Sequence, residues 1–159
     1  MNTTNPDQSL RKHLVTLLDA DTAHIKFDDA VKDFPEALRG KRPAGGPHSP
    51  WELLEHLRIT QSDILEFTRD AKHVSPEFPT GYWPSGEAPP TETAWDESVD
   101  AFRADLQALI VLTGDEAIDL HSRVAHGDGQ TVLREILLTA DHNAYHVGQL
   151  MMVRRILGA

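Results

Sequence analysis

Asp141-His142-Asn143-Ala144-Tyr145-His146-Val147-Gly148-Gln149-Leu150 lies in an apolar run from Val132 to Leu157 whose period predicts a long helix. Spacings of three and four residues place on one face of this helix Leu138, His142, Tyr145, His146, Gln149 and Val153. The imidazoles of His142 and His146 therefore share a helix face. Because residues four apart on a helix have Cβ atoms about 6 Å from each other, both rings can bind one metal ion.

A third ligand for such an ion has to come from another helix, and His56 is the best candidate. It lies in Trp51-Glu52-Leu53-Leu54-Glu55-His56-Leu57, and its helix face also carries Leu53, Leu57, Thr60 and Ile64. Burying three imidazoles without partners would cost several kcal/mol, since each unpaired polar group costs about 1–3 kcal/mol. A shared cation removes this cost. From the residues alone, three ordinary core histidines remain the alternative interpretation.

Length and charge limit the classes of protein and partner. A chain of 159 residues is long enough for one hydrophobic core, so we expect a single domain over residues 1–159. Its 25 acidic and 15 basic residues give a net charge of -10, which disfavours nucleic acid and anionic membranes as partners. No apolar segment approaches the roughly 20 residues of a membrane span, and residues 1–7 do not resemble a signal peptide. We expect a cytoplasmic protein.

Cysteine is absent from the sequence. Disulfides, thiolate metal ligands and a cysteine nucleophile are therefore all excluded. Any chemistry has to use nitrogen and oxygen groups of the protein, or a thiol that comes from outside.

The N-terminal third predicts a first helical block with an interruption. Asn5 is suited to the N-cap position and Pro6 to the first helical position. The apolar spacing changes phase after Leu18, which predicts a kink or break at residues 19–22. Helical spacing then resumes from Phe27 to Leu38, and the Gly- and Pro-rich residues 38–46 predict the end of the block.

Two further features follow in the next segment. Ser49-Pro50-Trp51-Glu52 is a capping box, which predicts a second helix that runs to about Arg69. Residues 70–90 contain five prolines and predict a long loop that crosses the bundle or covers a functional opening. Tyr82 and Trp83 either line the mouth of a pocket or only fasten this loop.

The C-terminal half contains the third and fourth helices. The third is expected from Thr91 or Thr93 to Gly114, with glycine in the left-handed C′ position. A loop over residues 115–130 follows, whose histidines His121 and His126 we interpret as surface or loop-anchoring residues. His24, earlier in the chain, is interpreted as a partly exposed or hydrogen-bonded helix histidine. The fourth helix is expected from Thr131 to Leu157, closed by Gly158. Four helices without strands predict an all-α four-helix bundle with long loops after the second and third helices.

The predicted metal site does not match the common zinc-protease motif. Asn143 follows His142, so the glutamate base of His-Glu-x-x-His is missing. Three neutral histidines without a thiolate suit Zn²⁺, Ni²⁺, Fe²⁺, Mn²⁺ or Co²⁺. Three protein ligands leave a coordination position open, which is typical of catalytic rather than structural sites.

The sequence resembles the DinB-like (DinB/YfiT-like) superfamily of metalloenzymes over nearly the whole chain. The family pattern has one histidine on the second helix and a His-x-x-x-His pair on the fourth, positions filled here by His56, His142 and His146. The resemblance implies a four-helix bundle, often a homodimer, that holds a divalent metal with solvent at the open position. Some members resemble thiol-dependent transferases or isomerases that use mycothiol or bacillithiol, and others are described as metal-dependent hydrolases.

Three functions remain open. The first is a divalent-metal enzyme that activates an external low-molecular-weight thiol for S-transfer to, or isomerisation of, a small-molecule substrate. A metal-bound thiol is deprotonated, whereas a free one has a pKa of about 8.5. The second is a hydrolase that uses metal-bound water. The third is a non-catalytic, stress-linked metal-binding bundle, because Glu52 and Glu55 beside His56 can equally be solvated residues and no catalytic residue is assigned.

Overall fold

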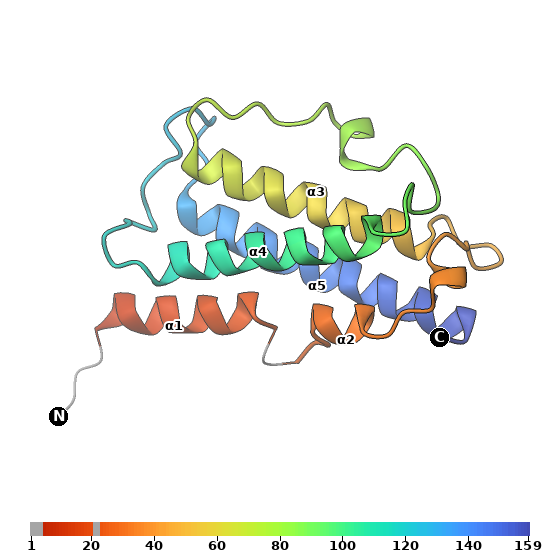
Figure 1. Ribbon diagram of the computed structural model, residues 1–159. Coiled ribbons are helices and arrows are strands. Elements are labelled where there is room, and N and C mark those ends of the chain that lie inside the picture. Colours follow the sequence, from red (N-terminus) through yellow and green to blue (C-terminus); the bar gives the residue numbers. More distant parts are fainter. Residues whose placement is uncertain (1–4, 21–22) are drawn as a thin grey trace.

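The computed structural model describes residues 5–20 and 23–159 and has an all-α architecture (Figure 1). Its elements are α1 (Pro6–Leu18), α2 (Phe27–Val31), η1 (Glu36–Leu38), α3 (Pro50–Arg69), η2 (Thr80–Tyr82), α4 (Ala94–Gly114) and α5 (Val132–Leu157). The four long helices α1, α3, α4 and α5 pack as a bundle, and the described residues form no strand. The predicted four-helix bundle is confirmed. None of the described helices is long and apolar enough to cross a membrane.

Capping residues start three of the long helices where the sequence predicts. The Asn5 side chain accepts a hydrogen bond from the N–H of Asp7 and begins α1. Ser49 and Glu52 form the reciprocal capping box at the start of α3, with the Ser49 N–H 2.7 Å from the Glu52 carboxylate. The Thr131 side chain accepts a hydrogen bond from the N–H of Arg134 and begins α5. These starts are confirmed because each depends on contacts within three residues.

The predicted break in the first helical block is confirmed over residues 19–20. α1 ends at Leu18, and Asp19 is its C-cap residue. Ala20 has a φ of 51°, in the left-handed region, so the helix does not continue through it. The remaining part of the predicted break, residues 21–22, lies outside the described residues.

The helix predicted from Phe27 to Leu38 is wrong in its second half. α2 ends at Val31, and only the short turn η1 follows. Asp33 has a φ of 50°, which no right-handed helix contains. Pro35 has no N–H and disfavours helical backbone at the residue before it. The apolar spacing therefore reflects burial in the core without a continuous helix.

Glycine was predicted in the left-handed position at the ends of two helices, and only one prediction holds. Gly158 ends α5 with a φ of 78°, as predicted. Gly114 instead lies inside α4, whose C-cap is Asp115 with an extended backbone. At this end, Arg11 donates to the carbonyl oxygens of Thr113 and Asp115. Terminal carbonyls that accept from a side chain need no glycine to close the helix.

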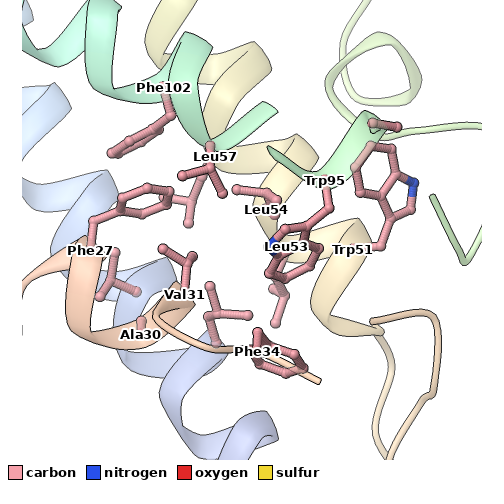
Figure 2. Close-up of a cluster of buried hydrophobic side chains, with 14 residues drawn as sticks. Phe27, Ala30, Val31, Phe34, Trp51, Leu53, Leu54, Leu57, Trp95 and Phe102 are labelled. Carbon is pink, nitrogen blue, oxygen red and sulfur yellow. The ribbon is translucent and has the colours of Figure 1, made fainter. Parts of the chain in front are cut away.

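The apolar core has two parts, which together hold α3 against α5. In the first part the rings of Phe27 and Phe102 stack with centroids 3.9 Å apart (Figure 2). Other buried members of this part include Val31, Phe34, Trp51, Leu53, Leu54, Leu57, Trp95, Val147 and Leu150. The second part consists of Leu14, Leu18, Leu65, Leu109, Leu120, Val132, Ile136 and Ala140. The close packing of α3 and α5 brings together two helices that carry histidines far apart in the sequence.

The long segment between α3 and α4 runs back along α3 (Figure 1). We call residues 70–93 the proline loop. Apart from the turn η2 it has no regular structure. The loop therefore follows α3 and does not cross the bundle, and it brings Tyr82 and Trp83 against His56.

Candidate metal centre

α3 presents His56 to the inside of the bundle, and the proline loop holds its ring. The residue is 9% exposed. Its Nδ1 lies 2.8 Å from the backbone oxygen of Tyr82. The indole of Trp83 stacks on the same ring, with centroids 4.0 Å apart and planes only 2° from parallel. His56 therefore has one ring face and one ring nitrogen fixed, and Nε2 is left for another partner.

α5 brings His142 and His146 to this nitrogen. The Nε2 atoms of both residues lie 3.1 Å from Nε2 of His56. One ligand atom from each of the three residues falls within 4.8 Å of the other two. The structure therefore brings together the three histidines that the sequence singled out, in an arrangement that can hold a metal ion.

All three imidazoles are uncharged at neutral pH. Burial, followed by the neighbouring histidines, lowers the pKa of His142 to about 3. Burial and the neighbouring His56 lower the pKa of His146 to about 4. Burial also lowers the pKa of His56 below its ordinary value. Neutral imidazole is the form that ligates metals.

Hydrogen bonds on the outer nitrogens determine where the ring protons lie. A neutral imidazole has one N–H and one acceptor nitrogen. The Nδ1–H of His56 donates to the Tyr82 carbonyl, and that of His146 donates to Oε1 of Gln149 at 2.7 Å. Both Nε2 atoms are then acceptors, yet they face each other at 3.1 Å. Two lone pairs in this position repel unless a cation lies between them.

The spacing of the nitrogens fits a divalent metal. Two nitrogens at the usual 2.0–2.1 Å from a zinc ion lie about 3.3 Å apart in tetrahedral geometry and about 2.9 Å apart in octahedral geometry. The observed separations of 3.1 Å fall between these values. The donor set of three neutral imidazoles suits the late first-row metals, and no metal is distinguished by it.

Asn143, which replaces the glutamate of the zinc-protease motif, has a structural role. It is buried, and its Nδ2 donates to Oε1 of Gln61 at 2.8 Å. Gln61 in turn donates to the backbone oxygen of Phe102 at 2.7 Å. This chain of buried hydrogen bonds links α5, α3 and α4 directly behind the histidines.

The interpretation of Glu52 and Glu55 as solvated residues is wrong, because both are buried. Burial by itself raises the pKa of each carboxyl group, but hydrogen bonds outweigh it and the net pKa is lowered. Arg42 is the principal partner of Glu52, and Arg58 that of Glu55. Ser98 also donates to Glu55 at 2.6 Å. Neither carboxylate is available as a general base.

The remaining candidates lie at the edge of the site or away from it. Tyr145 was placed on the histidine face, but it is 63% exposed and only touches the edge of the His146 ring. The three histidines that were not expected to be ligands, His24, His121 and His126, are all exposed and do not join the cluster.

Two aromatic contacts of the site were only partly foreseen. Trp83 was expected either to line a pocket or to fasten the loop, and it does the second by covering His56. His48 was not considered, yet its ring stacks on the opposite face of Trp83 with centroids 4.1 Å apart. Nothing in the local sequence around His48 marks it, because its partner is a residue of the proline loop.

A cavity of about 550 Å³ lies elsewhere in the bundle, between α1, α2, α4 and α5. Its lining includes Phe27, Phe102, Leu106 and Val147. None of the three clustered histidines lines it. The chemistry of the histidine cluster is therefore separate from this cavity.

Comparison with known proteins agrees with the geometry. A family model described as the DinB superfamily matches residues 20–150, a range that contains His56, His142 and His146. No curated protein matches the chain. Because the family model covers most of the sequence and the histidine pattern is folded into one cluster, the chain belongs to the DinB superfamily.

Proposed function

We propose that the protein is a divalent-metal-dependent enzyme that uses an external low-molecular-weight thiol for S-transfer or isomerisation. The observation that supports this most strongly is the convergence of ring nitrogens from His56, His142 and His146, two of whose separations are 3.1 Å. Three protein ligands leave at least one coordination position for a reactant, as in catalytic metal sites.

The residues of the chain prepare this site in three ways. The Tyr82 carbonyl and the Gln149 amide orient two of the rings. Burial keeps His142 and His146 neutral. Trp83 covers one ring face of His56 and excludes water from it. A bound divalent ion would lower the pKa of a coordinated thiol or water.

The surroundings of the cluster favour a thiol over water as the reactant. Hydrolysis usually needs a base that moves a proton during the reaction. The two carboxylates that flank His56 in the sequence of α3, Glu52 and Glu55, are engaged by arginines. A coordinated thiol loses its proton on binding, so that it needs no such base. The chain has no cysteine of its own, which fits a thiol that comes from outside.

The proposal is tested by measuring thiol consumption with metal-loaded and metal-free protein. Mycothiol, bacillithiol and glutathione are each mixed with monochlorobimane, in which the thiol sulfur bonds to carbon, chloride leaves and the thiol proton passes to the buffer. We expect metal-dependent loss of one thiol at least tenfold faster than with the His146→Ala variant. Metal-dependent cleavage of esters without thiol consumption would instead support the hydrolase, and no turnover would support the non-catalytic bundle.

We further propose that the protein is a homodimer that associates through α5. Four large apolar side chains lie on one side of this helix and are 45–63% exposed, namely Leu137, Tyr145, Met152 and Ile156. Gly148 lies among them and has open space where a Cβ would be, which allows close approach of a second helix. Exposed apolar patches of this kind commonly mark interfaces.

Light scattering at roughly tens of micromolar, an ordinary range for dimer affinities, measures the mass. We expect a dimer for the natural sequence and a monomer for the double variant Met152→Lys and Ile156→Lys, because two charges would be buried in the contact. Val111→Lys is the matched control, since Val111 is 62% exposed on α4. A monomer for the natural sequence would contradict the proposal.

A further inference from the structure

Asp63 on α3 is the point at which the proline loop is fastened to the bundle. Its two carboxylate oxygens accept separate hydrogen bonds, one from Nε2 of His73 and one from the hydroxyl of Tyr82, both at 2.7 Å. The Asp63 side chain is only 10% exposed. Both donors come from the proline loop, so a single carboxylate holds that loop at two places.

The loop residue that Asp63 holds is the same one that contacts the metal centre. The hydroxyl of Tyr82 reaches Asp63, while its backbone oxygen accepts from Nδ1 of His56 at 2.8 Å. The next residue, Trp83, stacks on the His56 ring. Asp63 and His56 are seven residues apart, which is about two helical turns, and therefore lie on the same face of α3.

We propose that Asp63 is a positioning residue of the metal centre, which acts on His56 through Tyr82. By fixing Tyr82, it fixes the carbonyl oxygen that accepts the hydrogen bond from the Nδ1–H of His56. The proton stays on Nδ1, and the Nε2 lone pair stays directed at His142 and His146. The inference rests on the proposed metal site, although the effect of Asp63 on the His56 ring proton does not require a metal.

The hydrogen bond from Tyr82 to Asp63, on which the link to His56 depends, is retained over a wide pH range. Burial, followed by the hydrogen bond to Asp63, raises the pKa of Tyr82 to about 12, so the hydroxyl remains a donor at neutral and moderately alkaline pH. Partners of the outer nitrogen of a ligating histidine fix its tautomer and orientation, and their loss typically weakens metal binding about 10- to 100-fold. Because Asp63 acts one residue further out, we expect the lower end of this range.

Four variants separate positioning from simple fastening of the loop. Tyr82→Phe removes the hydroxyl and keeps the carbonyl, and Asp63→Asn removes the charge that holds it. His73→Ala removes the other contact of the loop and leaves the Tyr82 link intact. Glu66→Gln is the matched control, because it makes the same carboxylate-to-amide change on α3 at an exposed ion pair with Arg69.

Zinc affinity is measured by competition with a chelating dye, and folding is checked by circular dichroism. We expect roughly tenfold weaker binding for Tyr82→Phe and Asp63→Asn, and natural affinity for His73→Ala and Glu66→Gln. A purely structural anchor would lower thermal stability in the first three variants and leave the zinc affinity unchanged. Natural zinc affinity in folded Tyr82→Phe and Asp63→Asn would overturn the inference.

Imidazole ¹⁵N chemical shifts of the metal-free protein give a second, independent measurement. We expect the His56 proton on Nδ1 in the natural sequence and a mixture of tautomers in Tyr82→Phe and Asp63→Asn. If the natural protein binds no zinc, the proposed function fails while this measurement still tests the link. Identical His56 shifts in the natural protein and these two variants would overturn the inference.

Discussion

We expect that replacing either His142 or His146 by alanine abolishes stoichiometric metal binding and leaves a folded, helical protein. Each variant removes one of the three nitrogens that converge within 4.8 Å, and two imidazoles hold a divalent ion far less tightly than three. The helix is retained because alanine has the highest helix propensity. The contacts that pack α5 into the apolar core come from Ile136, Val147 and Leu150. Replacing His142 or His146 leaves these contacts in place.

Elemental analysis after metal loading and dialysis measures this result. His126→Ala is the matched control, because His126 is exposed and outside the cluster, and we expect it to keep one ion per chain. His56→Gln should weaken binding and leave α3 folded, since the capping box formed by Ser49 and Glu52 is untouched. Unchanged metal content in both alanine variants would show that the ion is held elsewhere.

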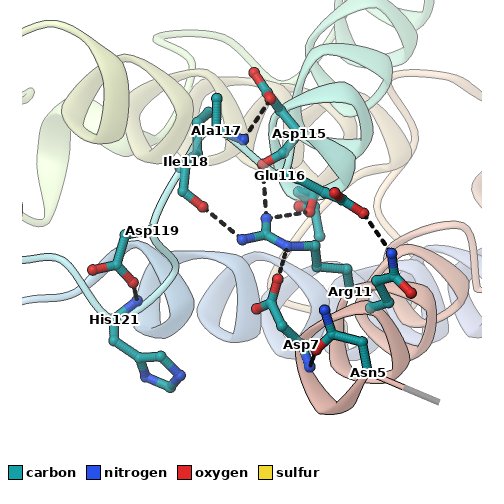
Figure 3. Close-up of polar contacts among 11 residues, drawn as sticks. Asn5, Asp7, Arg11, Asp115, Glu116, Ala117, Ile118, Asp119 and His121 are labelled. Atoms are coloured by element: carbon teal, nitrogen blue, oxygen red, sulfur yellow. Dashed lines mark hydrogen bonds and ion pairs between the residues drawn. The ribbon is translucent and has the colours of Figure 1, made fainter. Parts of the chain in front are cut away.

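We expect Arg11→Met to lower the free energy of unfolding by about 3 kcal/mol, because it leaves carbonyl groups without their charged donor. Arg11 is buried in α1 and donates to the backbone oxygens of Thr113, Asp115 and Ile118 at 2.6–3.1 Å (Figure 3). Its ion pair with the half-exposed Asp7 adds little. Methionine keeps most of the volume and removes every donor.

Thermal unfolding of the metal-free protein measures the effect. A loss of about 3 kcal/mol corresponds to a Tm lower by roughly 6–12 °C for a domain of this size. Arg103→Met is the control, because the ion pairs that Arg103 forms with Asp28 and Asp100 are exposed, and we expect a change within about 0.5 kcal/mol. Equal Tm shifts in the two variants would contradict the role assigned to Arg11.

The features predicted correctly from the sequence depend on short-range contacts or on strict spacing. The start of α3 follows from Ser49 and Glu52, which bond to each other across three residues. The pairing of His142 with His146 follows from the period of one helix. The convergence of His56 on this pair is a long-range contact, and its prediction relied on the direction of its helix face and on the family resemblance.

The features that were missed depend on partners far away in the sequence. Arg11 has the pattern of an ordinary polar helix residue, and its acceptors lie more than 100 residues further along the chain. Glu55 is paired with the nearby Arg58, but its burial depends on Ser98 in another helix. The proposed link from Asp63 to the histidine cluster requires the path of the proline loop, which no local spacing specifies.

X-ray absorption spectroscopy of the zinc-loaded protein tests most directly whether three histidines hold one ion. The predicted spectrum contains three imidazole nitrogens at about 2.0–2.1 Å, together with at least one light atom from solvent. In His56→Gln, scattering from the distant ring atoms should indicate two imidazoles on the zinc instead of three. A first shell of carboxylate oxygens, or a natural protein with fewer than three imidazoles on its zinc, would contradict the metal centre formed by His56, His142 and His146.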